Sequence, residues 1–193
     1  MVARMQKMKS GNLGGIERHN QRTFANHSNP DIDPKKQDLN YDLVNDEPIN
    51  YKEKIQEIID TQRESQRAIR KDAVLVNEWI LTSNQEFFEG MSEQETRKFF
   101  QDTLEYFSEK FGTQNMAYAQ VHLDETTPHM HLGVVPMTEG KLSGKTVFNR
   151  QTLKEIQSDL PEFLKGKGFN IERGIEGSER KNLSVATYKK VVN

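Results

Sequence analysis

Several short segments of the chain carry apolar residues in the patterns that are typical of β-strands. Residues 116–122 and 129–137 follow each other closely and predict two strands joined by a short connection, an antiparallel hairpin. Residues 73–82 are apolar on both faces, which indicates a central strand. Shorter strands are expected at 1–8 and 39–44. Within 116–122, alternation puts Met116, Tyr118, Gln120 and His122 on one face and Ala117, Ala119 and Val121 on the other.

Other segments repeat their apolar residues every three or four positions and predict helices. These helices are expected at 13–26, 53–67, 92–112 and 153–163. Ser92 and Glu95 form the sequence signature of a capping box at the start of the third helix, and Gly112 ends it. Pro161 lies inside the last helix and is expected to kink or split it.

Strands and helices mixed along the chain, with a hairpin among them, predict an α+β fold. A length of 193 residues suits a single domain, which we take to span 1–193. Val185, Tyr188 and Val192 recur at helical spacing, and the sequence stops at Asn193 inside that pattern. We therefore expect a C-terminally truncated fragment of a longer protein.

The composition excludes several classes of protein. The longest apolar runs, such as 73–76 and 134–137, are far shorter than the ~18 residues of a membrane span. The N-terminus lacks the apolar segment of a secretory signal. There is no cysteine, which excludes disulfides and thiolate metal sites and fits a reducing cytoplasm. Any metal must therefore bind to histidine and carboxylate groups.

The formal net charge is −2, but the charged residues are distributed unevenly along the chain. Residues 1–30 hold five Lys/Arg against one Glu, and residues 141–193 hold eleven Lys/Arg against six acidic residues. The middle, 31–140, holds eleven basic against twenty-two acidic residues. Basic ends suit a polyanionic partner, because Lys and Arg contacts to phosphate release counterions. The clusters could equally be ordinary solvated faces.

Three of the five histidines, His122, His129 and His131, fall within ten residues. His129 and His131 are two positions apart on a strand, so they point the same way about 7 Å apart. The turn at 124–128 allows His122 to approach them. Three imidazoles with an open side are typical of a catalytic metal site, and this spacing favours that interpretation over scattered surface or packing histidines.

Two carboxylates, Asp124 and Glu125, lie in the connecting turn. Glu125 could act as a general base or a metal ligand, or support the metal ligands from behind. Asp124 is interpreted as a supporting carboxylate or as ordinary turn chemistry.

Near the N-terminus, His19 and Arg22 are three positions apart and share a helix face. A neutral imidazole is a competent nucleophile, and a guanidinium can hold a phosphate by two hydrogen bonds. Taken alone, this pair of residues is more typical of a solvent-exposed helix face than of a catalytic site. His27 is interpreted as a partner of the helix C-terminal dipole.

At these residues the chain resembles the Mob/Pre family of plasmid mobilisation proteins, the MobV-type relaxases. The resemblance covers essentially the whole chain and rests on three motifs in the order of the family. They are His19-Asn-Gln-Arg22 after the Gly-rich segment 9–15, Leu39-Asn-Tyr-Asp-Leu43, and His122-Leu-Asp-Glu125-Thr-Thr-Pro128-His129-Met-His131.

The resemblance implies a nuclease fold of the HUH kind, with a central antiparallel sheet flanked by helices. It implies a divalent metal ion, Mn²⁺ or Mg²⁺, held by His122, His129 and His131. It implies His19 as the nucleophile in place of the more usual tyrosine. The sequence agrees with this, because no tyrosine precedes Tyr41. Glu125 and Arg22 are then candidates for general base and phosphate clamp.

The function implied is strand-specific nicking of DNA at a plasmid origin of transfer, bound as a hairpin with adjoining single strand, through a 5′-phosphate joined to histidine. The full-length relatives carry a C-terminal helical region for dimerisation and membrane association, so no membrane contact is expected of this fragment. Two alternatives stay open. One is a DNA-binding protein of plasmid recombination, and the other is a rolling-circle replication initiator of related fold.

Overall fold

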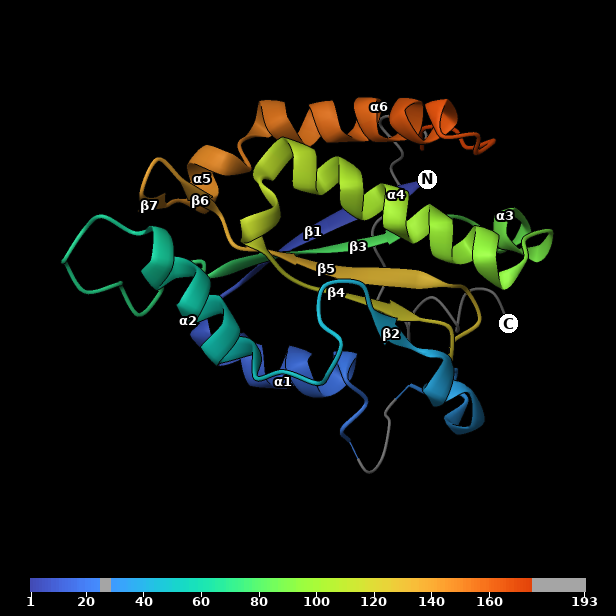
Figure 1. The fold of residues 1–193 in the computed structure, drawn as a ribbon, viewed down its shortest axis with the longest axis horizontal. Coiled ribbons are helices and arrows are strands. Elements are labelled where there is room, and N and C mark those ends of the chain that lie inside the picture. Colours follow the sequence, from blue (N-terminus) through green and yellow to red (C-terminus); the bar gives the residue numbers. More distant parts are fainter. Residues whose placement is uncertain (25–28, 175–193) are drawn as a thin grey trace.

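The structure, a computed structural model, describes residues 1–24 and 29–174. A five-stranded antiparallel sheet forms the centre of this part of the chain (Figure 1). Its strands, in spatial order, are β1 (Val2–Met8), β3 (Val76–Thr82), β5 (His129–Val134), β4 (Met116–His122) and β2 (Tyr41–Asp42). β6 (Met137–Thr138) and β7 (Lys141–Leu142) form a separate small hairpin. The expected α+β class, the central antiparallel sheet and the hairpin of β4 and β5 are confirmed.

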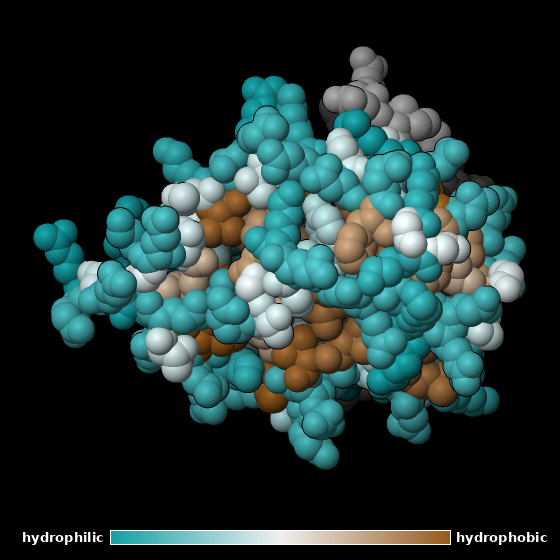
Figure 2. Space-filling view, turned by 45° about the horizontal axis from the view of Figure 1, so that its top comes forward, coloured by the Kyte–Doolittle hydropathy of each residue, from teal (hydrophilic) through white to brown (hydrophobic). Residues whose placement is uncertain are grey.

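Helices cover both faces of the sheet (Figure 1). The long helices α4 (Glu93–Phe111) and α6 (Arg150–Gly166) lie on one face, and α1 (Ser10–Asn20) and α2 (Tyr51–Gln62) lie on the other. The remaining helices are short: α3 (Gln85–Glu89), α5 (Gly144–Val147) and the 3₁₀ helices η1 (Pro34–Leu39) and η2 (Thr113–Asn115). The surface seen over α4 and α6 is mostly hydrophilic, with apolar side chains between the polar ones (Figure 2).

Two hydrophobic clusters, one on each face, hold these layers together. The first contains Trp79 and the phenylalanines of α4, and the second contains Leu13 of α1 with Tyr51 and the isoleucines of α2. Each apolar side chain removed from water contributes roughly 1.5–3 kcal/mol. In the described residues no helix is long and apolar enough to cross a membrane.

Local signals placed α4 correctly, but other helix boundaries differ from those expected. The Ser92–Glu95 capping box and the end at Gly112 are confirmed. The first helix spans Ser10–Asn20 rather than 13–26, because the glycines at 11, 14 and 15 are helical and Arg22 adopts a left-handed φ of 54° just beyond the end. α2 ends at Gln62 rather than 67, and the helix α3 was not expected.

The expected split of the last helix at Pro161 is wrong. α6 runs unbroken from Arg150 to Gly166, because Leu160, Pro161 and Leu164 are all buried and this packing outweighs the backbone hydrogen bond that proline cannot donate. The expected roles of His27 and of the repeat at 185–192 lie outside the described residues.

A β-bulge near the start of β4 changes which residues share a face. Met116 pairs with Val134 and Tyr118 with Gly133, so β4 has one residue more than β5 at this point. Ala117 and Tyr118 consequently both pack towards α1 and α2, whereas Met116 packs in the cluster under α4. The expectations that Met116 shares a face with Tyr118 and His122, and that Ala117 shares one with Ala119 and Val121, are therefore wrong. The alternation from Tyr118 onwards is as expected.

Gly133 is the point where the sheet approaches an aromatic ring most closely. A Cβ atom on Gly133 would lie 2.4 Å from the Tyr118 ring, which is stacked on Tyr51 at a centroid distance of 4.0 Å. We predict that Gly133→Ala lowers the free energy of unfolding in urea by about 1–3 kcal/mol, because the ring must move. Gly15→Ala is the matched control, because its Cβ would meet nothing within 4 Å and alanine should stabilise α1 by about 0.5–1 kcal/mol. Equal stability of Gly133→Ala and the wild type would contradict the prediction.

Candidate metal centre

Four histidines converge on the sheet face covered by α1 and α2. In the hairpin His122 pairs with His129, and His131 is two positions further along β5, so the three share a face. Their ring centroids lie 5.0–5.2 Å apart. His19, at the end of α1, lies 5.6 Å from His122 and 5.2 Å from His131 between ring centroids. The structure thus brings together the three predicted metal ligands and the predicted nucleophile.

Hydrogen bonds fix how each of the three sheet histidines faces the centre. His122 Nε2 lies 2.9 Å from the Asn20 carbonyl oxygen, and His129 Nδ1 lies 2.9 Å from that of Thr127. Because a carbonyl oxygen can only accept, these nitrogens carry the proton and donate. The remaining nitrogens, His122 Nδ1 and His129 Nε2, then bear lone pairs and face each other at 3.3 Å. Two facing lone pairs repel unless a cation lies near both, so the arrangement fits a metal ion.

A buried glutamate orients the third sheet histidine. Glu78 of β3 is 1% exposed, and its Oε1 lies 3.1 Å from His131 Nδ1. Its Oε2 accepts hydrogen bonds from the Tyr118 hydroxyl at 2.7 Å and from the Asn20 amide at 3.4 Å. A carboxylate behind a ligating histidine sets the ring orientation and raises its basicity. Sequence reasoning missed Glu78, although a single charged residue inside an apolar strand was a signal for it.

Two compact sets of ligand atoms share His122. One contains His19, His122 and His131, and the other contains His122, Glu125 and His129, with the ligand atoms of each set within 4.8 Å of one another. All donors are imidazole nitrogen or carboxylate oxygen, which suit divalent first-row metals. His19 is thus close enough either to bind an ion or to attack a group held beside it.

Burial favours the neutral form of His19, His122 and His129. The pKa of His19 is lowered to about 4, first by burial and then by the nearby His131 and Arg22. Burial and the neighbouring His131 lower the pKa values of His122 and His129 as well. Neutral imidazoles are the form that binds metal and the form that attacks phosphorus.

The Arg22 guanidinium joins α1 to the turn that carries Asp124 and Glu125. Its Nε and Nη2 donate to the two Asp124 oxygens at 2.7 and 2.8 Å, and Nη2 also donates to Glu125 Oε1 at 2.7 Å. Nη1 donates to the His19 carbonyl oxygen at 3.0 Å. Burial alone would raise the pKa of Asp124, but the hydrogen bonds from Arg22 hold it below its ordinary value. Every nitrogen of the Arg22 guanidinium therefore donates a hydrogen bond within the protein.

Glu125 lies between this network and the histidines. Its Oε1 is 3.7 Å from His129 Nε2 and 3.9 Å from His122 Nδ1, and its Oε2 accepts from the Asn29 amide at 2.8 Å. The carboxylate is thus close to the metal-facing nitrogens, as the sequence predicted.

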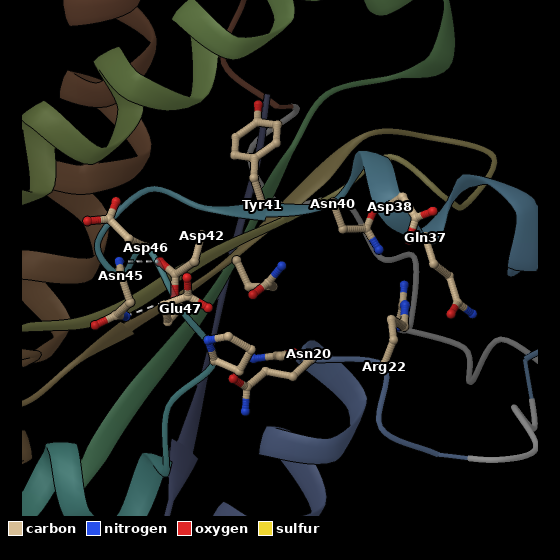
Figure 3. Close-up of a pocket in the computed structure, with 13 residues that line it drawn as sticks. Asn20, Arg22, Gln37, Asp38, Asn40, Tyr41, Asp42, Asn45, Asp46 and Glu47 are labelled. Carbon is tan, nitrogen blue, oxygen red and sulfur yellow. Dashed lines mark hydrogen bonds between the residues drawn. The ribbon is translucent and has the colours of Figure 1, made fainter.

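Tyr41 is the first tyrosine of the chain and could compete with His19 as the nucleophile, but it lies on the opposite side of the sheet. It pairs with Val121, whose side chain packs in the cluster under α4, and the Arg97 guanidinium lies 4.2 Å above its ring. Figure 3 shows its side chain pointing away from Asn20 and Arg22. Burial raises the pKa of the Tyr41 hydroxyl to about 12, so ionisation is unfavourable. Tyr41 is poorly placed to attack a group held by the histidines.

Comparison with known proteins finds consistent relatives. A family model described as plasmid recombination enzyme, Mob_Pre, matches residues 1–190. A plasmid recombination enzyme of Streptococcus agalactiae is 52% identical over 193 residues, which cover 100% of this chain and 39% of that protein. One of Lactiplantibacillus plantarum is 53% identical over 97% of this chain and 52% of that protein. The chain spans about half or less of the length of these relatives.

Solved structures are similar over nearly the full chain. The Mn-bound crystal structure of the MobM relaxase domain with plasmid pMV158 oriT DNA has a TM-score of 0.96 and 51% sequence identity, covering 100% of this chain and 98% of that one. The same domain bound to a 26-nucleotide pMV158 oriT DNA has a TM-score of 0.80 and 48% identity, covering 97% and 98%.

The buried imidazoles make the metal-free domain sensitive to acid. The pKa values of His19, His122 and His129 are lowered in the folded state, so the stability that these groups contribute is complete above the unfolded value of about 6.5 and is lost as the pH falls towards 4. We predict that the free energy of unfolding in EDTA decreases steadily from pH 7 to pH 4.5. His129→Gln should decrease less steeply, because one such group is gone. A slope that is the same in both proteins would contradict this assignment.

Proposed function

The chain belongs to the Mob_Pre family of plasmid recombination enzymes, and we propose that it is a relaxase domain, which nicks one DNA strand at a plasmid origin of transfer and stays attached to the 5′ end. The observation that carries the proposal is the convergence of four histidines, three from the sheet and His19 from α1. The solved relatives described as relaxase domains with oriT DNA support it.

The metal ion of this site would bind to His122, His129 and His131, with Glu125 next to it. The facing lone pairs of His122 and His129 and the carboxylate behind His131 support this assignment. A divalent ion supplies Lewis acidity, which withdraws charge from a phosphate oxygen. Imidazole donors favour Mn²⁺ over Mg²⁺, which prefers oxygen ligands, and the solved relatives are described as Mn-bound.

His19 is the proposed nucleophile. Its neutral imidazole attacks the scissile phosphorus, a nitrogen–phosphorus bond forms, and the bond from phosphorus to the 3′ oxygen breaks. The leaving oxygen takes a proton and becomes a free 3′-hydroxyl, and the imidazole loses its own ring proton. Glu125, 16% exposed, is the proposed acceptor of that proton. The phosphoramidate retains the energy needed to rejoin the strand after transfer.

We propose a different role for Arg22 from the phosphate clamp that the sequence indicated. Each of its nitrogens donates within the protein, to Asp124, Glu125 or the His19 carbonyl. Arg22 therefore acts as a positioning residue, which holds His19 and Glu125 in register. Phosphate contacts are then proposed for other basic groups of the segments 1–30 and 141–193.

Origin-of-transfer DNA, as a hairpin with adjoining single strand, is the proposed partner. Plasmid DNA places this reaction in the cytoplasm. Dimerisation of the full-length protein stays a prediction. The relatives are described as plasmid recombination enzymes, so the alternative is a role in recombination in which the chain binds plasmid DNA without cutting it. A nicking assay on supercoiled plasmid with pMV158 oriT, with and without Mn²⁺, separates the two.

The metal assignment predicts a separation of cutting from binding. His129→Ala should abolish nicking of that plasmid in Mn²⁺, because one of the three ligands is lost. DNA affinity, measured by fluorescence anisotropy, should change less than about threefold, because phosphate contacts dominate it. Gln56→Ala on the exposed face of α2 is the control and should nick normally. Normal nicking by His129→Ala would overturn the metal assignment.

The nucleophile assignment predicts the chemistry of the covalent adduct. A phosphoramidate is labile in acid and comparatively stable in base, whereas a tyrosyl phosphodiester survives mild acid. We expect the trapped protein–DNA adduct to disappear after mild acid treatment, as followed on a denaturing gel. His19→Ala should form no adduct but still bind Mn²⁺, whereas Tyr41→Phe should form it. An acid-stable adduct in His19→Ala would transfer the role to Tyr41, and loss of Mn²⁺ binding would make His19 a ligand.

A further inference from the structure

A polar cavity of about 320 Å³ lies beside the histidine cluster. Its walls come from the end of α1, from the segment 37–48 and from β4, and Figure 3 shows the residues that line it. Its size is within the range of small-molecule sites. The described residues that line it are rich in amide and carboxylate groups, and Arg22 is the one cation among them. None of the steps of the nicking reaction described above uses this cavity.

Some of the lining polar groups are already satisfied and only shape the wall. Asp42 accepts hydrogen bonds from the backbone of Val44, Asn45 and Ala119, and the Gln21 amide exchanges two hydrogen bonds with the backbone of Ile49. These contacts keep the segment 42–49 in place. The N–H group and the oxygen lone pair that Gln21 uses in these two bonds are not available to a ligand.

Two other lining groups make no hydrogen bond or ion pair within the described residues. Gln120 of β4 is 8% exposed, yet its amide has no partner there. Asp38 of η1 is exposed, and its carboxylate likewise lacks a partner among those residues. Because neither side chain is bonded within this part of the protein, both can bond to a molecule in the cavity. Gln120 offers an amide NH₂ group with two donors, and its oxygen and the Asp38 carboxylate offer several acceptors.

The charge of the cavity selects the kind of group that can enter. Asp38, Asp46 and Glu47 are exposed carboxylates on its wall, while the Arg22 charge is neutralised by Asp124 and Glu125. A phosphate would be repelled. An uncharged nucleobase would not, and an amino group on its edge would donate to these oxygens.

The position of Gln120 relates the cavity to the scissile phosphate. Gln120 and His122 are two positions apart on β4 and share a face, so their side chains begin about 7 Å from each other. A nucleotide next to the phosphate held at the histidines could place its base there.

We propose that this cavity binds one unpaired nucleobase next to the nick, and that Gln120 and Asp38 select a base that carries an exocyclic amino group. The proposal rests on the proposed function for its substrate, single-stranded DNA. It adds a base-reading site to a reaction that otherwise uses only the DNA backbone.

The test is the binding of two labelled oligonucleotides of about twelve residues, oligodeoxycytidine (dC12) and oligothymidine (dT12), measured by fluorescence anisotropy in EDTA. The two pyrimidines differ in the amino group of cytosine, so the wild type should bind dC12 about tenfold more tightly. Gln120→Leu and Asp38→Asn should each reduce this ratio at least threefold, and Gln56→Ala should preserve it. Because Gln120 is buried, the exposed Asp38→Asn keeps the test valid if Gln120→Leu does not fold. The ratio cancels the general gain in affinity from removing a negative charge.

Each outcome bears on one proposal. A wild-type ratio near one, or a ratio unchanged in Asp38→Asn, overturns the base site. A reduced ratio in Asp38→Asn supports it. Because EDTA removes the metal, the binding assay is independent of cutting. A protein that prefers dC12 but does not nick DNA in Mn²⁺ would reject the relaxase proposal and still support the base site.

Discussion

The buried ion pair of Arg22 with Asp124 connects segments of chain that are about one hundred residues apart. The two side chains are 5% and 0% exposed, and two hydrogen bonds join them. Removing one partner of such a pair leaves a buried charge and typically costs about 3–5 kcal/mol. The same guanidinium reaches the His19 carbonyl and Glu125. Where α1 ends and where the β4–β5 turn lies are therefore determined together.

A second set of buried contacts holds His131 in its orientation. Tyr118 stacks on Tyr51, donates to Glu78, and Glu78 meets His131. Gly133 leaves room for the Tyr118 ring. The ring orientation of His131 thus depends on the packing between β4, β5 and α2. This explains why a site formed on one hairpin needs a helix from elsewhere in the sequence.

The sequence was informative where the signal is local. Strand alternation from Tyr118 to His131 predicted the convergence of the three histidines, and the Ser92–Glu95 pair predicted the start of α4. It could not reveal partners that depend on tertiary packing. Glu78 is distant from His131 in sequence, and the internal bonding of Arg22 requires the fold. The unbroken helix at Pro161 has the same origin, because burial against α4 outweighs a local preference.

The bulge at the start of β4 bears on how this strand can change in length. Residues 116 and 118 are both paired with β5, and Ala117 is the extra residue between them. Loss of Ala117 would convert the bulge into a regular strand and leave His122 on its present face. Loss of one residue between Tyr118 and His122 would instead turn His122 to the side of α4. Insertions and deletions in natural variants should accordingly gather before Tyr118 and be absent from the stretch that follows it.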